Sequence, residues 1–143
     1  MGRVRAICIS ERKGTQKMFV EEANFIINHG IEHDAHAGNW HRQVSLLAYE
    51  TIADFNEQGA EVKDGAFGEN LVVEGIDLTT LPIGTKFTCN EVELELTQIG
   101  KECHTRCGIY YKMGSCIMPT DGVFAKVLKG GMIRVGDVIH EKF

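Results

Sequence analysis

The sequence predicts a mainly β protein of the α+β class, in which short strands form a barrel with a few small helices at its rim. Three observations support this fold. Short apolar segments are separated by turns along most of the chain. The 143 residues include sixteen glycines and two prolines, a composition typical of many tight turns. Two alternating segments flank Asn90-Glu91, which indicates a hairpin with a two-residue turn.

The alternation of residues is clearest just after this turn. Val92, Leu94 and Leu96 alternate with Glu93 and Glu95, which predicts a strand with one buried face and one solvent-facing face. The expected strands cover residues 2–10, 44–47, 71–74, 85–89, 92–98, 123–128 and 138–140.

Two segments carry helix patterns. In residues 20–30, acids near the start and Gly30 at the end predict a short helix, with a strand through 25–27 as the alternative. In residues 48–58, Tyr49, Ile52 and Phe55 recur at helical spacing before Gly59, which predicts an amphipathic helix.

The length and charge of the chain limit the function classes. We expect a single domain over residues 1–143. No segment approaches the roughly 20 apolar residues of a membrane span, and the N-terminus lacks a secretory signal pattern, so we expect a cytoplasmic protein without a membrane partner. Twenty acidic against fifteen basic residues also argue against a nucleic-acid surface.

The segment Gln98–Cys116 is the strongest candidate for chemistry. It holds three of the five cysteines, Cys103, Cys107 and Cys116, together with His104 and Arg106. Basic neighbours lower the pKa of a thiol and favour the reactive thiolate, although Glu102 acts in the opposite direction on Cys103. An odd number of cysteines without a secretion signal favours thiols, metal ligands or a redox pair over a disulfide framework.

Two polar loops are further candidates for a binding site. The block from His33 to Arg42 combines imidazole, indole and guanidinium groups, which suit an anionic or ring-bearing ligand, but it is also an ordinary polar loop. Glu69 and Asn70 follow Gly68 and either project polar groups toward a ligand or cap the turn as an Asx turn.

Together these blocks resemble the MOSC domain, named for the C-terminal region of molybdenum-cofactor sulfurases. The matching phrases are Gly30-Ile31-Glu32-x-Asp34-Ala35-His36-Ala37-Gly38, His41-Arg42-Gln43-Val44-Ser45-Leu46-Leu47 and Gly65-Ala66-Phe67-Gly68-Glu69-Asn70, with residues 76–84 and the region from Gln98 continuing the match. The family usually has glycine where His33 stands, which suggests a positive φ at this position.

The resemblance implies a MOSC-like β-barrel and a role related to the molybdenum cofactor. By order along the chain, Cys103 matches the cysteine proposed to accept sulfur as a persulfide or to ligate the metal of the cofactor. We expect sulfur transfer to be the reaction if the domain is an enzyme, with Cys103 as the catalytic residue. The expected metal ligands are Cys103 and Cys107, and the expected cofactor-binding residues are Asp34, His36, His41, Arg42, Ser45, Glu69, Asn70, His104 and Arg106.

The expected partners are a pyridoxal-phosphate-dependent cysteine desulfurase and molybdoenzymes or cofactor-synthesis proteins. Two alternatives remain open at this point. Cys103, Cys107 and Cys116 with a histidine could form a zinc site in a structural or redox-sensing module, because a three-residue gap is within the usual zinc-ligand spacing. The domain could also be a non-catalytic carrier of finished molybdenum cofactor.

Overall fold

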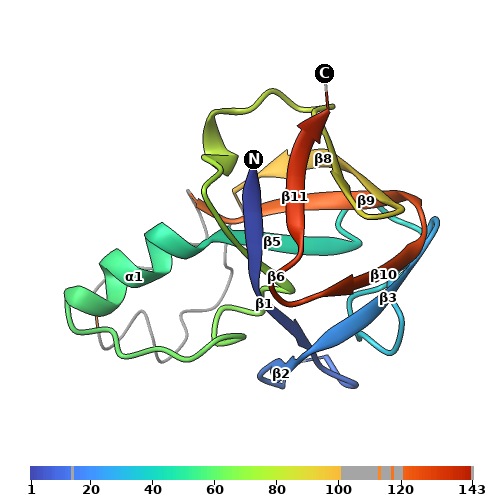
Figure 1. The fold of residues 1–143 in the computed structure, drawn as a ribbon. Coiled ribbons are helices and arrows are strands. Elements are labelled where there is room, and N and C mark those ends of the chain that lie inside the picture. Colours follow the sequence, from blue (N-terminus) through green and yellow to red (C-terminus); the bar gives the residue numbers. More distant parts are fainter. Residues whose placement is uncertain (14, 101–112, 114–116, 118–120, 143) are drawn as a thin grey trace.

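The computed structural model describes residues 1–13, 15–100, 113, 117 and 121–142. Among these residues strands are the main regular structure, and one short α-helix stands to the side of them (Figure 1). The mainly β fold predicted from the sequence is therefore confirmed. The principal sheet has the strand order β11-β7-β8-β9-β5-β6-β1-β2. Its strands are β1 (Gly2–Ile9), β2 (Met18–Val20), β5 (Val44–Ala48), β6 (Leu71–Glu74), β7 (Lys86–Cys89), β8 (Val92–Ile99), β9 (Val123–Lys129) and β11 (Val138–Lys142).

An additional pairing between β11 and β1 closes this sheet into a barrel. Gly2 pairs with Ile139 and Arg3 with Val138, so the first and last strands lie side by side (Figure 1). The strand pairs in the ring are antiparallel except β5 with β6, which run parallel. A smaller sheet packs beside the barrel in the order β10-β3-β4. Its strands are β3 (Glu22–Ile26), β4 (Gly30–Ile31) and β10 (Gly131–Arg134).

Apolar side chains on the barrel strands divide between two faces. Leu46 on β5 and Leu71 on β6 belong to the main core, whereas the next residues along each strand, Leu47 and Val72, face the second cluster. This division follows from the period of two in a β-strand. On β1 the register shifts between Val4 and Ala6, and this shift re-phases the side chains along the strand.

The second cluster lies under helix α1 (Tyr49–Glu57), which matches the helix predicted over residues 48–58. Ile52 and Phe55 are its buried residues, and they join Ala6, Cys8, Leu47, Val72 and Phe124 in this cluster. A short 3₁₀-helix follows β6 at Leu78–Thr80. Within the described residues, no helix is long and apolar enough to cross a membrane.

The helix predicted over residues 20–30 is wrong. The alternative, a strand over residues 25–27, is correct in type, but the strand spans Glu22–Ile26. Ala23 and Phe25 on β3 are buried at alternate positions, and β3 pairs with β10, a strand that the sequence patterns did not predict. Gly30 has a different role from ending a helix. A Cβ atom on this residue would lie 2.7 Å from the carbonyl oxygen of Gln43, so the close approach of two backbones requires glycine.

Candidate functional site

A pocket of about 50 Å³ opens where two of the predicted motif loops meet the barrel. It has aromatic walls and a few polar groups, the composition expected of a small-molecule site. Its lining residues are His36, Trp40, Arg42, Ser45, Phe67, Gly68, Asn70 and Phe124. Four of the predicted site residues, His36, Arg42, Ser45 and Asn70, are thus brought together from separate parts of the sequence.

Arg42 is the cation of this pocket. Its Cζ atom lies 4.6 Å from the centroid of the Trp40 ring and 5.6 Å from that of Phe124. Its Nε atom is buried and has no hydrogen-bond partner among the described residues. A buried donor without a partner costs free energy, so this N–H group suits an acceptor that enters the pocket from outside the described chain.

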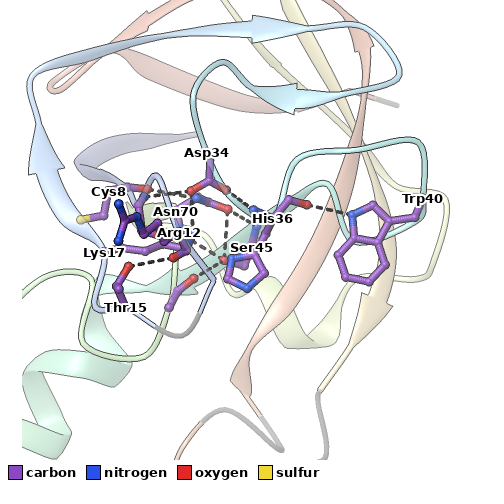
Figure 2. A network of polar contacts seen from close by, with 11 residues as sticks. Cys8, Arg12, Thr15, Lys17, Asp34, His36, Trp40, Ser45 and Asn70 are labelled. Atoms are coloured by element: carbon purple, nitrogen blue, oxygen red, sulfur yellow. Dashed lines mark hydrogen bonds and ion pairs between the residues drawn. The ribbon is translucent and has the colours of Figure 1, made fainter.

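Ser45 and Asn70 form the polar floor of the pocket. The backbone N–H of Ser45 donates to Oδ1 of Asn70 at 2.9 Å, and the backbone N–H of Asn70 donates to Oγ of Ser45 at 3.0 Å. The Asn70 Nδ2 group donates to the carbonyl of Cys8 at 3.0 Å (Figure 2). The side chain of Asn70 therefore connects three barrel strands, because it joins β5 and β1 at the residue before β6 begins.

Asp34 lies outside the pocket lining and holds one of its walls. Its Oδ1 atom accepts the amide N–H of Ser10 at 3.1 Å and the Nζ of Lys17 at 2.6 Å. Its Oδ2 atom accepts the amide N–H of His36 at 3.3 Å. Because Asp34 is buried and fully engaged with the protein, it orients the loop that carries His36 and does not face the cavity itself.

Glu69 has a corresponding role in the second wall. Its two carboxylate oxygens accept the backbone N–H groups of Gly65 and Phe67, at 2.9 and 3.0 Å. The side chain is completely buried, and burial raises the pKa of this carboxyl even though the backbone N–H donors act to lower it. This buried acid holds the glycine turn that places Phe67 and Gly68 at the pocket.

Two histidines that flank the loop of His36 lie outside the pocket lining. His41 is exposed, and its Nε2 atom lies 2.9 Å from Oε1 of Gln98. The His33 ring is exposed and approaches Glu32 at 3.1 Å. The backbone φ of His33 is +68°, so the positive φ expected from the usual glycine is confirmed.

The predicted sulfur chemistry falls on Cys103, His104, Arg106, Cys107 and Cys116, which lie outside the described residues. The two described cysteines have no features of a reactive site. Burial raises the pKa of the Cys8 thiol to about 12 and that of Cys89 to about 11. The described residues contain no cluster of three or more potential metal ligands, and the zinc alternative, which needs the three undescribed cysteines, stays a prediction.

Part of this site does not follow from the sequence patterns. Phe67 stands in a glycine motif that gives it no role of its own, and Phe124 and Lys17 stand outside the predicted site motifs. Phe124 lies in an apolar strand, where nothing in the residue pattern distinguishes a pocket wall from core. The burial of Lys17 could be inferred only from its buried acidic partner, Asp34. A single lysine before a strand is otherwise typical of the protein surface.

Comparison with known proteins agrees with this picture. The family model described as MOSC domain matches residues 33–140. A solved structure of the YuaD protein from Bacillus subtilis superposes with a TM-score of 0.79 at 18% identity, covering 96% of this chain and 93% of that one. YiiM from Geobacillus stearothermophilus superposes with a TM-score of 0.75 at 16% identity, and the match covers 100% of this chain and 76% of that one. YiiM from Escherichia coli superposes with a TM-score of 0.67 at 19% identity, and the match covers 99% of this chain and 70% of that one. Comparison with curated proteins gives no match.

Proposed function

This chain belongs to the MOSC domain family, and we propose that it binds the molybdenum cofactor in the pocket around Arg42. Membership of the family supports a role related to this cofactor in general terms. The observation that carries the specific proposal is the buried Nε of Arg42, which has no partner among the described residues. A guanidinium group offers paired N–H donors to phosphate or oxo groups, which are the anionic parts of the cofactor.

The chemistry of the pocket fits one part of this ligand. The cavity of about 50 Å³ suits a single anionic group more closely than a complete pterin ring system. Trp40 lines the pocket and is exposed, so it offers an aromatic surface on which a planar ring can stack. Arg42 would therefore hold an anionic group, Trp40 would contact the ring, and the Ser45–Asn70 floor would keep the cavity in shape.

Cys103 supplies the proposed sulfur chemistry. Its thiolate attacks the terminal sulfur of a persulfide on a cysteine desulfurase, so that a new S–S bond forms on Cys103 and the desulfurase cysteine leaves as a thiolate. Lys101 and Arg106 are close to Cys103 in the sequence and support this step, because positive charge near a thiol favours the thiolate. The bound cofactor supplies the metal centre that Cys103 could instead ligate.

The binding proposal can be tested with the complete chain, expressed in a host that makes the molybdenum cofactor. Purified wild-type protein should release a fluorescent pterin after oxidation, in near-stoichiometric amount. Arg42→Met should lose most of this pterin while keeping its thermal stability. The matched control is Arg5→Met, because the Cζ of Arg5 also stacks on an aromatic ring, that of Tyr49 at 4.2 Å, outside the pocket. Equal pterin content in the two variants would contradict the proposal.

The sulfur step has its own measurement. Incubation with a cysteine desulfurase and cysteine should add the mass of one sulfur atom to the wild-type protein, and the added atom should map to the peptide that contains Cys103. Cys103→Ser should not be loaded, whereas Cys107→Ser should be. Undiminished loading of Cys103→Ser would exclude Cys103 as the sulfur acceptor, with no consequence for the pterin assay.

A further inference from the structure

Lys17 lies at the junction of the two loops that form the pocket. We call residues 34–40 the histidine wall and residues 65–70 the glycine wall. The Lys17 side chain is 1% exposed, and its Nζ atom forms an ion pair with Asp34 at 2.6 Å. It also lies 3.2 Å from the hydroxyl oxygen of Ser10. Lys17 is not among the residues that line the cavity, so it contacts the walls from outside the pocket lining.

The contact with the histidine wall passes through Asp34. The carboxylate that binds Lys17 also accepts the amide N–H of His36 at 3.3 Å. The carbonyl of His36 in turn accepts the indole N–H of Trp40 at 2.8 Å (Figure 2). The position of Asp34 therefore controls the backbone of His36 and, through it, the indole of Trp40, and both of these residues line the pocket.

The contact with the glycine wall is made by the backbone of Lys17. A Cβ atom on Gly65 would lie 2.2 Å from the Lys17 carbonyl oxygen, so the two backbone segments are in contact at this point. The amide N–H of Gly65 donates to Oε2 of Glu69, whose Oε1 accepts from Phe67. Any displacement of the Lys17 backbone would therefore press on the turn that carries Phe67 and Gly68.

We propose that Lys17 is a positioning residue that fixes the histidine wall and the glycine wall relative to each other. The relevance of this role to binding rests on the proposed function, whereas the wall positions can be measured without a ligand. A buried ion pair is weak evidence for stability, because well-packed apolar residues often replace one without loss. Its geometric effect is more distinctive, since Asp34 can present both oxygens to Ser10 and His36 only while Lys17 compensates its buried charge.

The test uses Trp40, the one tryptophan of the chain, as a reporter. In Lys17→Met, Asp34 is left without its cation and should shift toward solvent. We expect the Trp40 emission maximum to move, iodide quenching of Trp40 to change, and the His36 amide to exchange roughly tenfold faster. The matched control is Ile139→Ala, a core substitution on β11 that also destabilises the fold. In this control the Trp40 emission and the His36 exchange should keep their wild-type values at temperatures where the protein is folded.

A second variant keeps the test decisive if Lys17→Met does not fold. Lys17→Met with Asp34→Asn removes both charges and leaves an amide oxygen as an acceptor, so it should be more stable than Lys17→Met alone. It should still show the altered Trp40 quenching. Wild-type Trp40 emission, quenching and His36 exchange in a folded Lys17 variant would overturn the positioning role. Absence of pterin from the wild-type protein would instead contradict only the proposed function.

Discussion

Gly65 and Lys17 approach each other so closely that a Cβ atom on Gly65 would lie 2.2 Å from the Lys17 carbonyl oxygen. Gly65 also has a φ of +87°, in the region that disfavours residues with side chains. We therefore predict that Gly65→Ala lowers the free energy of unfolding by about 3 kcal/mol or more, from left-handed strain and overpacking together. Urea unfolding would measure this loss.

Gly68 provides the control for this prediction. Its φ is +76°, but a Cβ atom there would meet no atom within 4 Å. Gly68→Ala should therefore cost only the backbone strain, about 1–2 kcal/mol. Equal losses for the two variants would show that the contact with Lys17 contributes nothing.

Burial of Cys8 and Cys89 predicts that neither thiol reacts in the folded protein. The pKa of Cys8 is raised to about 12 and that of Cys89 to about 11, so at pH 8 almost no thiolate is present at either position. Iodoacetamide should leave both residues unlabelled in the native protein and label both in urea, as measured by peptide mass spectrometry. Rapid labelling of Cys8 under native conditions would contradict the buried position that the structure gives it.

Most of the barrel could be predicted because its strands carry their own patterns. The β7–β8 hairpin has alternating residues on both sides of Asn90, whose φ of +55° fits the predicted turn. The helix predicted over residues 20–30 failed because its acids serve a different purpose. Glu22 pairs with Arg134 across the β3–β10 ladder at 2.9 Å, and this partner is more than a hundred residues away in sequence.

The pocket could be predicted only in part, for a similar reason. His36, Arg42, Ser45 and Asn70 stand in recognisable polar motifs, and all four line the cavity. The sequence pattern does not separate residues that face the cavity from those that hold its walls, such as Asp34 and Glu69, because both kinds are polar residues in glycine-rich loops. Only the direction of each side chain in the fold makes this distinction.

The strained backbone at His33 predicts a stabilising substitution. His33 has a φ of +68°, and its exposed contact with Glu32 contributes little stability. His33→Gly should therefore raise the free energy of unfolding by about 0.5–1 kcal/mol, as measured by thermal or urea unfolding. Asn28→Gly is the control, because Asn28 has a φ of +56° but asparagine tolerates this region well. A gain at Asn28 as large as that at His33 would argue against a specific strain at His33.

The buried Glu69 carboxyl predicts a pH dependence of stability with a defined sign. Its pKa is raised in the folded protein above the ordinary value of 4.5, chiefly by burial. At pH values between the unfolded and the folded pKa, the native state binds more protons than the unfolded state. The contribution of Glu69 to the free energy of unfolding therefore falls as the pH rises. This contribution is fully present below about pH 4.5 and is lost as the pH passes through the folded pKa.

The measurement compares wild type with Glu69→Gln, which keeps the shape of the side chain but does not titrate. Urea unfolding of both proteins at a series of pH values from 4 upward gives the difference in their free energies of unfolding, in which the other titrating groups cancel to first order. The stability of the wild type relative to Glu69→Gln should decrease with rising pH. A relative stability that increases with pH would mean that the two backbone N–H donors, from Gly65 and Phe67, outweigh burial and hold this carboxyl ionised.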